Sequence, residues 1–110
     1  LIETKIAKIP ICIIYDYPKE KASLAQINGP IAHRFEIYIK GIEIANGYQE
    51  LKSSESYRLR FNDELNKREK LNKKIPLIDE QFLNELNEKE LPFCSGVAIG
   101  IERLFSQTGL

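Results

Sequence analysis

The stretch FEIYIKGIEIANGYQEL, residues 35–51, decides the fold of this chain. Isoleucines alternate with other residues on both sides of Lys40-Gly41, which predicts two antiparallel strands joined by a two-residue hairpin loop. The predicted cross-strand pairs are Ile39 with Ile42, Tyr38 with Glu43, and Glu36 with Ala45. Polar side chains set into this apolar ladder are unusual for a purely structural strand and mark the hairpin as a candidate site.

Two carboxylates share one face of the predicted hairpin. Glu36 and Glu43 are diagonal neighbours in this register, about 7–8 Å apart at their Cα atoms. Two carboxylates at that spacing can hold one hard cation, and Mg²⁺ bound together with a nucleotide phosphate is the usual case. An edge hairpin with solvated glutamates fits the same spacing, so the pattern alone leaves both interpretations open.

The alternation changes phase around Gly47. Glu43 lies on an odd position, whereas Asn46, Tyr48 and Glu50 lie on even ones. A glycine bulge at Gly47 would bring these three side chains to the lining of a pocket beside the metal face.

Length and composition limit the class of protein and its partners. A chain of 110 residues with 43% hydrophobic and 29% charged content is typical of one small globular domain. Its 16 basic and 16 acidic residues give no global preference for nucleic acid or an anionic membrane, and no apolar run reaches membrane-spanning length. Cys12 and Cys94 are expected to be core residues of a cytoplasmic protein. The lone His33 is expected to have a solvated or capping role.

The remaining elements follow from apolar runs and capping residues. Residues 11–15 (ICIIY) predict a strand buried on both faces, ended by a turn at residues 16–18. Ser53 or Ser54 is expected to cap a helix that runs to about Leu71, and Asp79 a second helix that ends near residues 91–92.

A glycine-flanked strand leads into a last helix near Gly100. The missing side chains at Gly96 and Gly100 allow a ligand to approach the backbone. Arg103, one turn into the helix, carries a permanent charge suited to phosphate. Close packing against a neighbouring strand explains the glycines equally well.

These motifs resemble a known family. The segment GVAIGIERL (residues 96–104) resembles motif 3 of the class II aminoacyl-tRNA synthetases, and RFEIYIKGIEIANGYQEL (residues 34–51) resembles the strands upstream of it in the lysyl branch. With residues 15–27 and 92–104, the resemblance covers nearly the whole chain. It is greatest to the elongation factor P lysyl-lysyltransferases, which activate β-lysine.

The resemblance implies an α+β fold, part of the class II antiparallel sheet flanked by helices, with ATP and Mg²⁺ as cofactors. It implies metal ligands at Glu36 and Glu43, and an ATP site made of Glu43, Ile44, Gly100 and Arg103. Arg103 is the residue implied to be catalytic, holding the γ-phosphate. The implied substrate residues are Asn46 for the head group, Tyr48 for the alkyl chain, Glu50 for an amine, and Ala98.

Ala98 separates two subfamilies. Lysyl-tRNA synthetases carry glycine at this motif 3 position, and the extra methyl resembles the elongation factor P enzymes. On the pocket floor it would disfavour an α-amino group and favour β-lysine, by about 1–3 kcal/mol.

The resemblance also implies that residues 1–110 are the C-terminal part of a catalytic domain, with motif 3 included and motifs 1 and 2 upstream. The chain alone is then expected to be inactive, and the full-length protein a homodimer without a membrane partner. The implied partners are elongation factor P and β-lysine or lysine. A piece of a lysyl-tRNA synthetase, with tRNA as partner, and a non-catalytic binding module are the alternatives; intact Glu36, Glu43 and Arg103 argue against the last.

Overall fold

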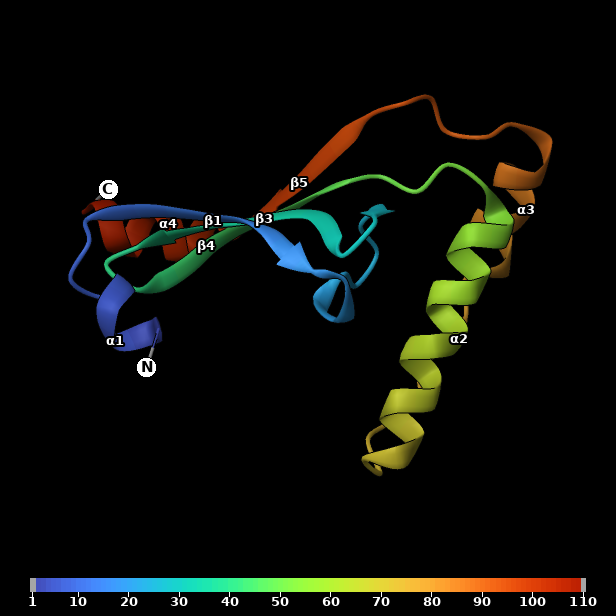
Figure 1. Cartoon of the computed structure of the whole chain (residues 1–110), viewed down its shortest axis with the longest axis horizontal. Helices are drawn as coiled ribbons and strands as arrows, with labels where there is room; N and C mark the ends of the chain where they lie inside the picture. Colours follow the sequence, from blue (N-terminus) through green and yellow to red (C-terminus); the bar gives the residue numbers. More distant parts are fainter. Residues whose placement is uncertain (1, 110) are drawn as a thin grey trace. The chain divides into compact units, whose positions relative to one another are not determined.

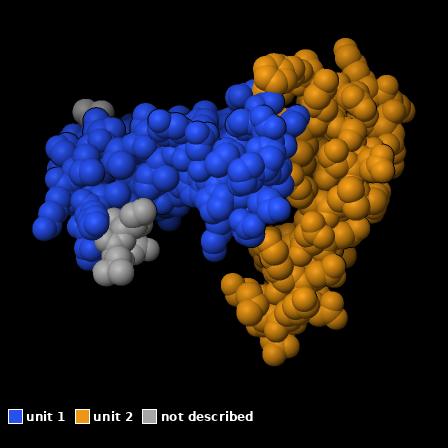
Figure 2. All heavy atoms as spheres, in the orientation of Figure 1, with its two compact units in different colours: residues 1–49, 95–110 blue, residues 50–94 orange. Residues whose placement is uncertain are grey.

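The computed structural model describes the backbone of residues 2–109 and the side chains of residues 4–109. The chain forms two compact units (Figure 2). Unit 1 comprises residues 1–49 and 95–110, and unit 2 comprises residues 50–94. Unit 1 contains all of the candidate site residues except Glu50.

Unit 1 is an antiparallel sheet with short helices (Figure 1). Its strands are ordered β1-β3-β4-β5, and β2 also pairs with β3. This confirms the predicted α+β class with an antiparallel sheet flanked by helices. The elements of unit 1 are α1 (Ile2–Ile6), β1 (Ile11–Pro18), the 3-10 helix η1 (Lys19–Lys21), β2 (Ile27–Asn28), β3 (Ile31–Ile39), β4 (Ile42–Gln49), β5 (Ser95–Ile99) and α4 (Ile101–Thr108).

The hairpin between β3 and β4 forms as predicted. Lys40 and Gly41 make its two-residue loop with φ of 50° and 81°, the left-handed pair that matches the twist of the flanking strands. Glycine is required at position 41 because an added Cβ would lie 2.8 Å from the Cα of Ala7. The pairs Ile39 with Ile42 and Tyr38 with Glu43 are also confirmed.

The position of the bulge differs from the prediction. Glu36 pairs with Asn46 rather than with Ala45, because the extra residue in β4 is Ile44 and not a residue at Gly47. A contact from far along the chain supports the bulge at this position: the Gly100 N–H donates to the Ile44 carbonyl at 2.8 Å. Gly47 instead lies under the ring of Phe35, its cross-strand partner.

The predictions for β1 were wrong in two respects. Ile11, Ile13 and Tyr15 are exposed rather than buried, since they lie on a sheet face that the described residues do not cover. No turn ends the strand at residues 16–18; β1 continues to Pro18 through an irregularity at Asp16, whose φ is 55°. The two cysteines are half-exposed and unpaired rather than buried.

Unit 2 is a pair of helices, α2 (Ser54–Lys70) and α3 (Glu80–Glu88). Both predicted caps form: the Ser53 hydroxyl accepts from the Ser56 N–H at 3.2 Å, and Asp79 accepts from the Phe82 N–H at 3.0 Å. The α3 helix ends a few residues earlier than predicted. Leu83 and Leu86 form the buried interior of this unit together with Tyr57. No helix in the described part of the chain is long and apolar enough to cross a membrane.

Candidate functional site

The implied ATP residues meet where α4 begins. The Gly100 N–H donates to the Ile44 carbonyl at 2.8 Å, and Arg103 Nη1 donates to the Glu43 carbonyl at 3.1 Å. These two hydrogen bonds join the bulge of β4 to the first turn of α4. They therefore bring together residues that are 56 and 60 positions apart in the sequence. The Arg103 side chain is exposed, so its charge is accessible to a ligand.

Strand register places the other candidates on one sheet face. Glu36 pairs with Asn46, Tyr38 with Glu43, Arg34 with Tyr48, and Asn46 with Ala98. Paired residues in antiparallel strands share a face, and residues two apart along a strand do too. The bulge at Ile44 keeps Glu43 on the same face as Asn46 in spite of their odd spacing. We call this the polar face, with Arg34, Glu36, Tyr38, Glu43, Asn46, Tyr48 and Ala98.

Glu36 is the buried charge of the polar face. It is 6% exposed, and its Oε1 accepts from Arg34 Nη2 at 2.5 Å. Its other oxygen accepts from the Tyr38 hydroxyl, and Tyr17 also hydrogen-bonds the carboxylate. Burial, then the hydrogen bond to Glu36, raises the pKa of Tyr38 to about 12 and raises that of Tyr17 in the same direction. Both phenols are therefore neutral donors at physiological pH.

Glu36 and Glu43 are the side chains that could hold a magnesium ion shared with a nucleotide. Among the described residues no three histidine, cysteine or acidic side chains cluster as a complete metal cage. Mg²⁺ does not need one, because it is usually held by one or two carboxylates with substrate phosphates and water completing the shell. Glu36 and Glu43 supply two carboxylates on one face. Each oxygen of Glu36 has two lone pairs, so the hydrogen bonds from Arg34 and the phenols leave acceptor capacity.

The implied substrate residues form a short polar chain. Asn46 Nδ2 donates to the Tyr48 hydroxyl at 3.1 Å, and that hydroxyl donates to Ser23 Oγ at 3.3 Å. Ala98, directly across from Asn46, is exposed at the surface of the polar face. The structure therefore brings Asn46, Tyr48 and Ala98 together.

Glu50 belongs to unit 2. Its Oε2 accepts from the Tyr57 hydroxyl at 3.0 Å. Burial, then this hydrogen bond, raises the pKa of Tyr57, so the phenol stays a donor to the carboxylate. The pocket role of Glu50 stays a prediction.

Sequence reasoning missed Arg34 and Tyr17. The Arg34 guanidinium contacts Glu36, Asn46 and the Lys21 carbonyl, and its Cζ lies 4.8 Å from the centre of the Tyr17 ring. A signal for Arg34 was present: in Arg-Phe-Glu on a strand, the two charged side chains share a face two residues apart.

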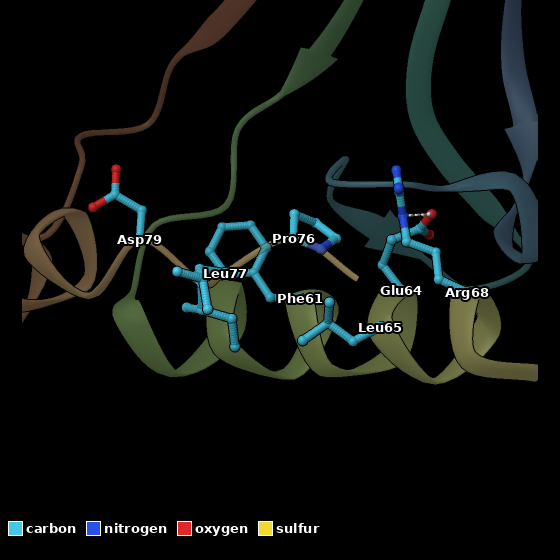
Figure 3. Close-up of a pocket in the computed structure, with 8 residues that line it drawn as sticks. Phe61, Glu64, Leu65, Arg68, Pro76, Leu77 and Asp79 are labelled. Atoms are coloured by element: carbon cyan, nitrogen blue, oxygen red, sulfur yellow. Dashed lines mark ion pairs between the residues drawn. The ribbon is translucent and has the colours of Figure 1, made fainter. Parts of the chain in front are cut away.

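Hollows occur in both units of the described part of the chain. The first, of about 230 Å³, lies in unit 1, and Arg34 and Tyr48 from the polar face contribute to its lining. The second, of about 290 Å³, lies in unit 2 between α2 and residues 76–79 (Figure 3). Phe61, Leu65 and Leu77 make it apolar, and none of the implied site residues lines it.

Comparison with known proteins gives a consistent family. The family model of tRNA synthetases class II (D, K and N) matches residues 2–108. Three similar proteins carry the name elongation factor P--(R)-beta-lysine ligase. The one from Avibacterium paragallinarum is 43% identical over 106 residues, which cover 94% of this chain and 33% of the relative. The one from Baumannia cicadellinicola subsp. Homalodisca coagulata is 47% identical over 98 residues, 86% of this chain and 30% of the relative.

The third, from Proteus mirabilis (strain HI4320), is 46% identical over 94 residues, which cover 83% of this chain and 29% of the relative. The chain thus spans about a third of the length of these curated relatives. Because the family match extends over nearly all of its residues, the chain belongs to the tRNA synthetases class II (D, K and N).

Proposed function

We propose that the protein containing this chain activates (R)-β-lysine with ATP and ligates it to a lysine side chain of elongation factor P. The names of the relatives support the ligase reaction and its two substrates. The observation that carries the proposal is the junction of α4 with the β4 bulge, where Arg103 donates to the carbonyl of Glu43, a residue of the polar face that also holds Asn46 and Ala98.

The chemistry follows in two steps. The substrate carboxylate attacks the α-phosphorus of ATP, the bond to the pyrophosphate group breaks, and a β-lysyl adenylate forms. The neutral amine of the acceptor lysine then attacks the adenylate carbonyl, AMP leaves, and the amine loses a proton as the amide forms. Such steps need positioning and charge stabilisation more than proton transfer by side chains.

Each residue has a proposed part in this reaction. Arg103 holds the γ-phosphate, Gly100 and Ile44 line the nucleotide site, and Glu36 and Glu43 hold Mg²⁺, which neutralises phosphate charge when bound. Asn46 binds the amino-acid head group, Tyr48 flanks the alkyl chain, Ala98 limits the space for an α-amino group, and Glu50 pairs with a substrate amine. We further expect a homodimer that acts in the cytoplasm, where its acceptor serves translation.

The first experiment tests the phosphate role in the full-length protein. Arg103→Ala should weaken ATP binding and slow ATP–pyrophosphate exchange by about tenfold or more, the usual effect of losing a charged hydrogen bond. Arg58→Ala is the matched control, because Arg58 is an exposed arginine of unit 2 whose partner is Glu80. Equal behaviour of the two variants would remove Arg103 from the phosphate site.

The second experiment tests the acceptor. Full-length protein, ATP and labelled β-lysine are incubated with elongation factor P or with tRNA, and label on each acceptor is measured. Label on elongation factor P is the expected result. Label on tRNA alone would favour a lysyl-tRNA synthetase, the second candidate that the matching family model supports.

A further inference from the structure

The Arg34 guanidinium makes directed contacts on three sides. Nη1 donates to the Lys21 carbonyl at 2.7 Å, Nη2 to Glu36 at 2.5 Å, and Nε to Asn46 Oδ1 at 3.3 Å. Its Cζ lies 4.8 Å from the centre of the Tyr17 ring and 5.9 Å from that of Tyr48. A planar group held by three hydrogen bonds and two rings has little freedom to rotate.

The contact with Asn46 fixes which way the amide points. An arginine Nε–H can only donate, so the atom facing it must be the amide oxygen of Asn46. The NH₂ group therefore points the other way. One of its hydrogens is directed to the Tyr48 hydroxyl at 3.1 Å, and the second has no partner among the described residues.

We propose that Arg34 is a positioning residue for the amino-acid substrate. Arg34 acts through Asn46. It fixes the Asn46 amide so that one N–H of that amide faces an anionic substrate group, such as a carboxylate. Arg34 itself does not touch the substrate. The proposal rests on the proposed function, because it assigns the amino-acid site to Asn46.

A simpler role for Arg34 is to neutralise buried Glu36. A lysine could do that, because an ammonium is a sufficient counter-charge for one carboxylate. A lysine cannot also reach Asn46 Oδ1 with a fixed second donor, since its charge is a single point at the end of a flexible chain. Arg34→Lys therefore separates the two roles.

The test uses the full-length protein and ATP–pyrophosphate exchange with β-lysine. Wild type is compared with Arg34→Lys, Asn46→Ala, the double variant, and Arg58→Lys. Arg58→Lys is the matched control because Arg58 also donates through two nitrogens to one carboxylate, but in unit 2. We expect Arg34→Lys to raise the KM for β-lysine about five- to tenfold, the usual effect of one misplaced hydrogen bond. The kcat and the KM for ATP should stay within about twofold of wild type on the same basis.

The double variant decides whether Arg34 acts through Asn46. If it does, adding Arg34→Lys to Asn46→Ala changes the KM for β-lysine no further. If instead the fold increases in KM of the two single variants multiply in the double variant, the proposal is overturned. An unchanged KM for β-lysine in Arg34→Lys would overturn it as well. A third result would also overturn the proposal: Arg34→Lys impairs kcat and both KM values to the same extent and lowers the thermal unfolding midpoint. Arg34 would then be only a structural partner of Glu36.

A second route does not disturb the pairing of Glu36. Asn46→Asp keeps an oxygen for Arg34 but loses the N–H donor, so it should raise the KM for β-lysine at least as much as Arg34→Lys. An unchanged KM in Asn46→Asp would refute the proposal independently. If wild-type protein exchanges pyrophosphate with neither β-lysine nor lysine, the proposed function fails, which is a result distinct from each of these.

Discussion

Replacement of Gly47 by alanine tests the packing that holds β4 in place, the strand that carries Glu43, Asn46 and Tyr48. Gly47 pairs with Phe35 on one side and Val97 on the other. A Cβ on Gly47 would overlap the Phe35 ring and lie 2.9 Å from the Gly96 carbonyl oxygen. The ring can rotate away, but the carbonyl is fixed in the backbone of β5. Strain must therefore be shared between the two strands.

The expected cost combines two opposing terms. Overpacking of this kind typically costs about 1–3 kcal/mol. Gly47 has no positive φ, so alanine fits its backbone and gains about 0.4–1 kcal/mol by restricting the unfolded chain. The net loss is about 1–2 kcal/mol of unfolding free energy, or roughly a five- to thirtyfold shift toward the unfolded state. Because Asn46 and Tyr48 flank Gly47, we also expect a higher KM for the amino acid.

The assay is urea unfolding of the full-length protein, read as the midpoint at constant slope. Gly100→Ala is the control, since its added Cβ would meet Arg103 Cδ at an ordinary 3.4 Å. Phe35→Leu combined with Gly47→Ala should recover part of the loss by relieving the ring. A urea midpoint for Gly47→Ala equal to that of wild type would refute the reasoning, because it would show that the backbone of β5 shifts without loss of stability.

Three further predictions concern single side chains in the full-length protein. Glu50→Gln keeps an acceptor for Tyr57 but removes the charge, so the KM for the amino acid should rise about tenfold or more with the KM for ATP unchanged; an effect confined to ATP would exclude Glu50 from the amino-acid site. Ala98→Gly removes a methyl and should improve use of α-lysine relative to β-lysine by about ten- to a hundredfold in adenylate formation; a constant ratio would contradict contact with the substrate. Because the pKa of Tyr38 is raised, the contribution of its neutral phenol to stability is complete below pH 10 and is lost as pH rises through about 12. Glu36→Gln should lower the titration midpoint of Tyr38, measured by the absorbance of the phenols; an unchanged midpoint would argue against the hydrogen bond to Glu36.

The local features were predictable from the sequence because their causes are local. The loop at Lys40-Gly41 follows from a short turn between alternating strands, and the caps at Ser53 and Asp79 follow from side chains that satisfy nearby N–H groups. The family resemblance supplied the roles of the site residues, which periodicity alone could not. Those roles stay predictions until the variants are measured.

What the sequence did not reveal depends on distant contacts. The apolar run of β1 predicts a strand buried on both faces, but composition does not say what covers a strand. In the structure, Ile11 and Ile13 are more than half exposed. Glycine favours irregular backbone, so the sequence predicts the bulge at Gly47. It lies at Ile44, whose carbonyl accepts a hydrogen bond from the N–H of Gly100, far along the chain. Arg34 was overlooked because its importance comes from Asn46 and Lys21, which its neighbours in sequence do not indicate.

The bulge at Ile44 explains how one strand can serve both halves of the proposed reaction. Glu43 and Asn46 are three residues apart, and on a regular strand an odd spacing sends two side chains to opposite faces. One extra residue between them restores the phase, so a candidate metal ligand and a candidate substrate ligand share the polar face. The same irregularity turns the carbonyls of Glu43 and Ile44 toward α4, where Arg103 and the Gly100 N–H bind them. A single backbone feature thus couples the position of α4, the proposed phosphate-binding helix, to that of the proposed amino-acid site.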